Sequence, residues 1–191
     1  MRSQTLKITY FVHGTTIDNE NGVASGWGNA KLSNLGIKQS IKLRKLIKNK
    51  KFDVVFSSDL RRAVDSSKLT FGKRAKMIKD KRLRECDYGK FTGGDAKEVD
   101  ILGPKRITRR FQNGESYKDV EKRMRSFLKY LSKNYPSKSV AVMSHRGPQL
   151  ALDVIVKGKT WKQAFKEDWR YKGHKGWKPG WQYRITLSTI K

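Results

Sequence analysis

Cysteine is nearly absent from this chain of 191 residues, because Cys86 is the only one. An internal disulfide is therefore impossible, which fits a reducing compartment, and we expect a cytoplasmic protein. Long apolar runs are also missing. No stretch reaches the length that a membrane span needs. The N-terminus is basic, but no long apolar stretch follows it, so we expect no secretory signal.

Acidic residues are scarce as well. The chain has 17 Asp and Glu against 44 Lys and Arg, which gives a formal net charge of +27, whereas a small soluble domain is comfortable at roughly 2–8 charges. A surface this basic attracts nucleic acid, anionic membranes and acidic proteins without selecting among them. We therefore expect non-specific binding to nucleic acid or anionic surfaces, and a monomer, since like-charged copies repel one another.

Three interpretations of the charge stay open: a nucleic-acid-binding protein, a solvated basic surface without a specific partner, and deliberate supercharging of an ordinary enzyme. The lysines are scattered over several expected helices and loops, and no zinc-finger, basic-zipper or RNA-recognition signature accompanies them. This scatter favours the second or third interpretation.

Short buried strands alternate with amphipathic helices along the chain, and its length suits one domain over residues 1–191. This alternation predicts a layered α/β fold. We expect strands at 6–12, 54–56, 75–78, 140–143 and 182–188. Helices are expected at 33–47, 59–69, 115–134, 147–156 and 159–167, with Ser33 capping the first and Ser58 or Asp59 the second. Residues 82–114 are expected to be irregular. The apolar face of the first helix would comprise Leu35, Ile41, Leu43, Leu46 and Ile47.

Two histidines follow expected strands. His13 comes after the first apolar run, and Ser144-His145 follows the run at 140–143. The Ser57-Ser58 pair also stands at an expected strand end. Because ligands gather at the carboxyl ends of strands in such sheets, these positions predict one site at one sheet edge. Taken singly, each histidine is more often an ordinary turn residue.

Several short motifs strengthen this prediction because they occur in a fixed order. They are Val12-His13-Gly14, a loop with Asn19, Gly26 and Trp27, Ser57-Ser58-Asp59-Leu60-Arg61-Arg62-Ala63, Leu83-Arg84-Glu85-Cys86-Asp87-Tyr88-Gly89, Gly114-Glu115-Ser116 and Ser144-His145. With these motifs, the chain resembles the histidine phosphatase superfamily in its phosphoglycerate-mutase-like branch over nearly its whole length. The resemblance implies a three-layer α/β/α sandwich with a mostly parallel central sheet.

The resemblance also implies the chemistry: hydrolysis of a small phosphomonoester through a covalent phosphohistidine on His13, with no cofactor and no metal. Neutral imidazole is a competent nucleophile near neutral pH. Glu85 would be the general acid, for which it must keep a proton near neutral pH. Arg62 and His145 would stabilise the charge on the equatorial phosphoryl oxygens.

Further phosphate contacts follow from the same resemblance. Gly14 and Asn19 fall at phosphate-binding positions, and the helix N-termini after Ser58 and Gly147 would add backbone donors.

Two residues depart from the family pattern. Val12 replaces an arginine that normally clamps the phosphate with two hydrogen bonds, and Arg146 stands where a small residue is more usual. We hypothesise that Arg146 restores the missing charge from the opposite side of the pocket. The alternative is that Arg146 simply points into solvent.

Other functions stay open. A mutase would use the same phosphoenzyme but return the phosphoryl group to a bound acid or sugar, although the compact segment from 82 to 115 favours hydrolysis. The loss of an arginine at position 12 also motivates an impaired anion-binding protein or an engineered cationic scaffold. The natural substrate is not evident from the sequence.

Overall fold

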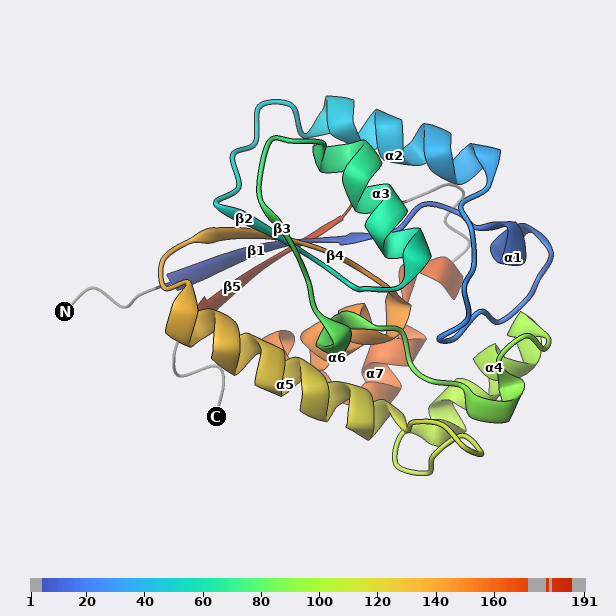
Figure 1. Ribbon diagram of the computed structural model, residues 1–191. Helices are drawn as coiled ribbons and strands as arrows, with labels where there is room; N and C mark the ends of the chain where they lie inside the picture. The colour runs from blue at the N-terminus through green and yellow to red at the C-terminus, as the bar shows by residue number, and fades with distance from the viewer. Residues whose placement is uncertain (1–4, 172–177, 179, 187–191) are drawn as a thin grey trace.

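A single mixed sheet lies at the centre of the fold (Figure 1), in the residues that the computed structural model describes, 5–171, 178 and 180–186. Its strands are β1 (Thr5–Val12), β2 (Val54–Ser57), β3 (Met77–Lys79), β4 (Ser139–Ser144) and β5 (Trp181–Thr186), in the order β3-β2-β4-β1-β5. The first four run parallel and β5 is antiparallel to β1. The sheet is therefore mostly parallel, as expected.

Helices cover both faces of this sheet and complete the predicted three layers (Figure 1). One face carries α2 (Asn34–Leu46) and α3 (Arg61–Phe71); the other carries α5 (Tyr117–Asn134), α6 (Arg146–Lys157) and α7 (Trp161–Lys166). The shorter helices are α1 (Ile17–Glu20), α4 (Ala96–Leu102) and the 3-10 turns η1 (Lys81–Leu83), η2 (Gly89–Phe91), η3 (Gly103–Arg106) and η4 (Trp169–Tyr171). Among the described residues, no helix is both long enough and apolar enough to cross a membrane.

Helix α5 follows the sequence prediction closely. Ser116 caps it, and the side chain of Asp119 returns a bond to the Ser116 backbone, which completes a capping box. The predicted inner face is buried throughout: Val120, Met124, Phe127, Leu128 and Leu131. This helix supplies much of the larger core on its face of the sheet.

The predicted apolar face of α2 is confirmed for Leu43 and Ile47, which are buried in the core, and is wrong for the other three residues. Leu35, Ile41 and Leu46 are 49%, 43% and 56% exposed, whereas Gly36 and Ser40 are buried along the helix. Small residues face inward here because the chain after β1 passes directly against the helix.

That close approach depends on two glycines. A Cβ at Gly36 would lie 2.0 Å from the carbonyl oxygen of Thr15, and a Cβ at Gly14 would lie 2.4 Å from the carbonyl oxygen of Gly36. Neither position accepts a side chain without moving the backbone. The loop that carries His13 is thus pinned onto α2.

Two further predictions need correction. Helix α3 begins at Arg61 with Leu60 as its N-cap, and neither Ser58 nor Asp59 caps it. Ser58 is used in the site described below, and Asp59 pairs with Arg84 at 2.6 Å. The segment 82–114, expected to be irregular, contains α4 and three 3-10 turns. The last two residues of the expected strand at 182–188 lie outside the described residues.

Candidate active site

The ends of three neighbouring strands bring the predicted residues together. Strand β4 lies between β2 and β1, and its register pairs Val12 with Ser144 and Ser57 with Met143. The residue that follows each strand therefore stands at the same sheet edge. The rings of His13 and His145 lie 5.0 Å apart between centroids, at 61°. The two histidines meet, as the sequence predicts.

His13 is held in one tautomer. Its Nδ1 lies 2.7 Å from the carbonyl oxygen of Gly14, which can only accept, so Nδ1 carries the proton and Nε2 presents its lone pair. Arg62 Nε donates toward that Nε2 at 3.2 Å. Burial lowers the pKa of His13 to about 3, the Arg62 charge lowers it too, and the Gly14 carbonyl opposes them. The imidazole is consequently neutral at physiological pH.

Arg62 projects from the first turn of α3 and is only 2% exposed. Besides the nucleophile candidate His13, it donates to the carbonyl oxygens of Gly28 at 3.2 Å and Gly26 at 2.7 Å. These bonds anchor the loop after β1 and fix the guanidinium beside the histidine ring.

His145 is fully buried, and burial together with the Arg62 charge holds its pKa well below the usual value. Its Nε2 lies 2.8 Å from Ser58 Oγ, which already accepts from the Leu60 amide. The hydroxyl has a second acceptor lone pair as well as its proton, so this contact fits either ring tautomer. The Nδ1 atom is buried with no hydrogen-bond partner among the described residues. When Nδ1 carries the ring proton, it is suited to donate to an oxygen of a bound ligand.

Glu85 is bound by backbone amides. Its Oε1 accepts from Cys86 and Gly147, both at 2.8 Å, and its Oε2 accepts from Arg146 at 3.1 Å. The expectation that the start of α6 offers its amides to a phosphate is therefore wrong for residues 146 and 147. With a single N–H at Oε2, that oxygen retains an open lone-pair position.

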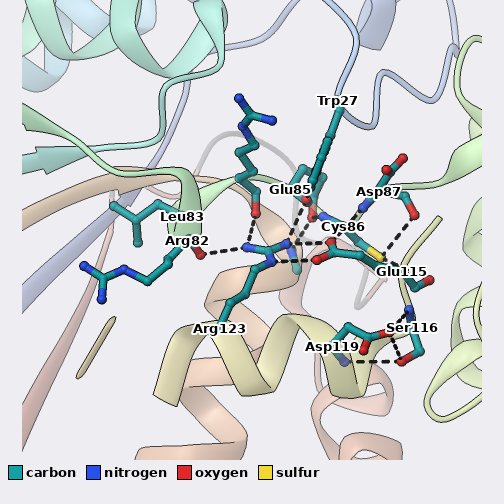
Figure 2. A network of polar contacts seen from close by, with 12 residues as sticks. Trp27, Arg82, Leu83, Glu85, Cys86, Asp87, Glu115, Ser116, Asp119 and Arg123 are labelled. Atoms are coloured by element: carbon teal, nitrogen blue, oxygen red, sulfur yellow. Dashed lines mark hydrogen bonds and ion pairs between the residues drawn. The ribbon is translucent and has the colours of Figure 1, made fainter. Parts of the chain in front are cut away.

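Arg123 on α5 braces the segment that carries Glu85 (Figure 2). Its guanidinium donates to the carbonyl oxygens of Arg82, Arg84 and Glu85 at 2.6–2.9 Å and pairs with Glu115 at 2.9 Å. The planar guanidinium, with its five donors, suits this task better than an ammonium group.

Trp27 also fixes Glu85 from the opposite side. Its Nε1 donates to the Glu85 carbonyl oxygen at 2.7 Å (Figure 2), and its ring lies under the Arg84 guanidinium at 4.7 Å. The loop after β1 and the segment with the candidate acid are thereby joined.

A pocket of about 630 Å³ opens at this sheet edge. Val12, His13, Arg62, Glu85 and Arg146 all line it, as does Asn19. We call His13 and Arg62, which line the pocket, together with the fully buried His145 and Ser58 next to them, the floor. The outer part, with Arg146, Trp169, Arg170 and Asp100, is the rim.

Two predicted phosphate ligands have other partners. The Gly14 amide donates to Ser66 Oγ at 3.0 Å. Asn19 Oδ1 accepts from the Thr16 amide at 3.0 Å as part of a capping box on α1. Asn19 still borders the pocket, whereas Gly14 acts on the site through its carbonyl, which orients His13.

Arg146 does not point into solvent, since its side chain is only 13% exposed. Its Nη1 and Nε donate to Asp100 and Asp168, both at 2.7 Å. Asp168 also accepts from Arg170 Nη1 at 2.7 Å. The rim thus holds two arginines and two aspartates in one network.

The sequence reasoning missed Arg123, Asp168 and Arg170. They belong to none of the recognised motifs. Their partners lie far away in the chain; Arg82, for example, is 41 residues from Arg123. The one available signal was the interleaving of Trp with Lys and Arg between 161 and 184.

With this geometry in place, the comparison with known proteins is decisive. The sequence model of the histidine phosphatase superfamily, branch 1, matches residues 10–171. The chain belongs to this superfamily. Its members are phosphatases or mutases that act on phosphorylated small molecules.

Curated and solved relatives agree. The chain is 29% identical over 156 residues to phosphoserine phosphatase 1 of Hydrogenobacter thermophilus, across 77% of this chain and 74% of that protein. The structure of a mycobacterial glucosyl-3-phosphoglycerate phosphatase with VO3 matches with a TM-score of 0.72 and 24% identity, over 86% of this chain and 87% of the other.

A phosphoglycerate mutase from Bacillus anthracis also matches, with a TM-score of 0.72 and 20% identity over 82% of each chain. At this identity, the two structural matches establish a shared fold, and this fold is phosphoglycerate-mutase-like, as the sequence resemblance implied.

Proposed function

We propose that this histidine phosphatase hydrolyses small phosphomonoesters through a phosphohistidine on Nε2 of His13. The observation that carries the proposal is the fixed tautomer of His13, whose Nε2 lone pair faces the pocket beside Arg62. A neutral imidazole held in this orientation needs no deprotonation before it attacks phosphorus.

In the first step, Nε2 of His13 forms a bond to phosphorus as the ester P–O bond breaks. The phosphoryl oxygens replace the imidazole as acceptors for Arg62, and the His145 Nδ1–H donates to the same group. These donors are already oriented, so they stabilise the transition-state charge without reorganising. Glu85, protonated at Oε2, gives its proton to the departing oxygen.

In the second step, water attacks the phosphorus of the phosphohistidine, and the P–Nε2 bond breaks. The Glu85 carboxylate takes the proton from this water and returns to its starting state. Inorganic phosphate leaves, and His13 regains its neutral form.

The rim residues have supporting roles in this proposal. Arg146 joins Asp100 of α4 to Asp168, so it shapes the opening where the leaving group lies. Asn19 borders the same opening from α1. The sequence hypothesis that Arg146 itself contacts the phosphoryl group stays a prediction, tested below.

The test is turnover of p-nitrophenyl phosphate by the intact chain and by His13→Ala. We expect release of inorganic phosphate from the intact chain, with loss of at least about 10³-fold in the variant. An acid-labile, alkali-stable phosphoenzyme should be trapped by rapid denaturation in base. Equal background rates in both proteins would overturn the proposal and favour an anion-binding protein.

Mutase activity is the second candidate within the family. It would give an isomer of a phosphorylated acid without net phosphate release, and it would need a phosphorylated primer. Incubating the chain with 3-phosphoglycerate and the primer 2,3-bisphosphoglycerate distinguishes the two, since hydrolysis yields inorganic phosphate and mutase action yields 2-phosphoglycerate.

A further inference from the structure

Position 12 leaves the phosphoryl pocket without the cation that the family places there. Val12 follows Tyr10 with the alternation of a strand, so both side chains lie on the sheet face covered by α5 and α6. A replacement for the missing charge must therefore reach the pocket from this face. Val12, being short, leaves room for a side chain from another element.

Arg170 of η4 meets this requirement. It lines the same pocket as Val12 and His13. Its guanidinium lies on the α6 face, because Nη1 reaches Gln149 of α6 at 3.4 Å and Cζ stands 5.7 Å from the ring of Trp181. Trp181 is the register partner of Tyr10 across the β1–β5 pair.

The hydrogen bonds of Arg170 leave one end of its guanidinium unused. Nη1 and the backbone amide both donate to Asp168 Oδ1, at 2.7 Å and 3.2 Å. Nη2 is buried and has no hydrogen-bond partner within the described part of the chain. A buried guanidinium nitrogen in this state calls for an acceptor.

The other cations at the pocket are less suited. Arg146 is paired with two carboxylates, Asp100 and Asp168, whereas among the described residues Arg170 is paired with Asp168 alone. Lys178 is exposed and lies against the Trp181 ring at 5.1 Å. Arg170 shares Asp168 with Arg146. Its positive charge is close enough to His13 to contribute to the lowered pKa of that histidine.

We infer that Arg170 is the second phosphoryl-binding arginine of this chain, supplying from η4 the charge that Val12 has removed from β1. Its Nη2 donates to an equatorial phosphoryl oxygen while Nη1 stays on Asp168. Asp168 is thus the positioning residue that aims the guanidinium, and Arg146 holds Asp168 from its other side.

This inference rests on the proposed function, and its test separates the two. Affinity for inorganic phosphate and orthovanadate is measured alongside kcat/KM for p-nitrophenyl phosphate. We expect Arg170→Gln to weaken oxyanion binding by about 10- to 100-fold and to lower kcat/KM by about 100-fold. Arg184→Gln is the matched control, because it removes one exposed positive charge of β5 at the opposite pocket.

Arg170→Lys distinguishes phosphoryl contact from simple neutralisation of Asp168. A lysine can pair with Asp168 but lacks the second nitrogen, so oxyanion affinity should still fall if Arg170 binds phosphate. Affinity and kcat/KM within threefold of the parent, in a folded Arg170→Lys protein, would overturn the inference. This variant keeps the ion pair and so remains informative if Arg170→Gln does not fold.

Rescue provides the final arm. Val12→Arg added to Arg170→Gln should recover at least tenfold of the lost oxyanion affinity, because an arginine then returns to the same face of the pocket. In the parent background the same change should add little. No recovery in the double variant would contradict a shared task for the two positions. A parent protein that binds phosphate but shows no His13-dependent turnover would overturn the proposed function alone.

Discussion

The floor and the rim of the pocket are built in different ways. The floor comes from the residues directly after strands β1, β2 and β4 and from Arg62 in the first turn of α3, and its side chains bond to backbone groups and to one another. The rim comes from α4, α6 and η4, and its charges are tied mainly to one another. Strand ends in a parallel sheet have fixed relative positions, whereas connecting segments vary in length and composition.

This difference separates the residues that the sequence motifs identified from those that they did not. His13, Arg62 and His145 of the floor belong to motifs quoted from the sequence, whereas Asp168 and Arg170 of the rim belong to none. Residues placed by neighbouring strand ends are therefore easier to anticipate from sequence than residues placed by connecting segments.

The largest expected difference between the two regions is between two arginines. Arg62→Ala should lower kcat/KM by about 10²–10³-fold, because it removes a preorganised donor from the phosphoryl group. Arg146→Ala should cost less, since its guanidinium is bound to Asp100 and Asp168. Steady-state kinetics with p-nitrophenyl phosphate checks both variants. Equal losses of kcat/KM would instead indicate that Arg146 contacts the phosphoryl group as Arg62 does.

Gly147→Ala tests the junction between the regions. A Cβ there would stand 2.4 Å from Glu85 Oε1 and must displace the carboxyl group. A misplacement of about 1 Å can cost up to about 10²-fold in rate. We expect kcat to fall strongly for an alkyl phosphate, whose leaving group needs a proton, and much less for p-nitrophenyl phosphate. Alanine has a higher helix propensity than glycine. The substitution should therefore not lower the melting temperature by weakening the helix itself.

A substitution of Arg123, which braces the segment with Glu85, should also lower kcat more for an alkyl phosphate than for p-nitrophenyl phosphate, but by a smaller factor. Arg123→Lys loses the planar fork to three carbonyl oxygens, at an expected cost of about 1–3 kcal/mol in the free energy of unfolding. Arg125→Lys, two residues along the same helix and partly exposed, is the matched control. Urea denaturation gives the stability. An equal loss of activity toward alkyl and aryl phosphates would show that Arg123 does not act through Glu85.

The last expected effect is a change in the free energy of unfolding with pH. Burial lowers the pKa of His13 to about 3 and holds that of His145 well below its usual value of 6.5. At a pH between the lowered pKa of the folded state and the ordinary value of 6.5, a histidine binds a proton in the unfolded chain but not in the folded chain. The free energy of unfolding therefore falls as pH drops below 6.5. Each histidine contributes at most about 1.4 kcal/mol per pH unit.

The rim should respond at lower pH. Burial raises the pKa of Asp168, but Arg170 and Arg146 outweigh it and leave the pKa below its ordinary value of 3.8. Its stabilising contribution is therefore present above pH 3.8 and is lost as pH falls further.

The histidine prediction is checked by urea denaturation at pH 7, 6, 5 and 4. A plot of the free energy of unfolding against pH should have a shallower slope for His145→Asn than for the parent. An unchanged slope would contradict the buried, neutral state of His145.

Local patterns predicted the elements whose physics is local. The apolar spacing of α5 requires nothing beyond its own segment, and the predicted inner face is confirmed. In α2 the same analysis failed for Leu35, Ile41 and Leu46, since part of the inward face was selected by the backbone of Thr15 passing over Gly36. No hydrophobic pattern records such a contact between distant segments.

The site divides similarly. His13, Arg62, Glu85 and His145 were found because each belongs to a motif of neighbouring residues. Arg170 was not found, because its role depends on Asp168, on a strand partner of Tyr10, and on the space left by a valine.

The sequence by itself determined the layered α/β fold, the strand-end histidines, the excess of positive charge and the valine directly before the first histidine, because these follow from residue types and from spacing along the chain. Only the tertiary structure decided which tautomer His13 adopts, which carboxylates neutralise Arg146, and how two arginines share Asp168. Those outcomes depend on distances between segments far apart in the chain, and such distances exist only once the chain has packed.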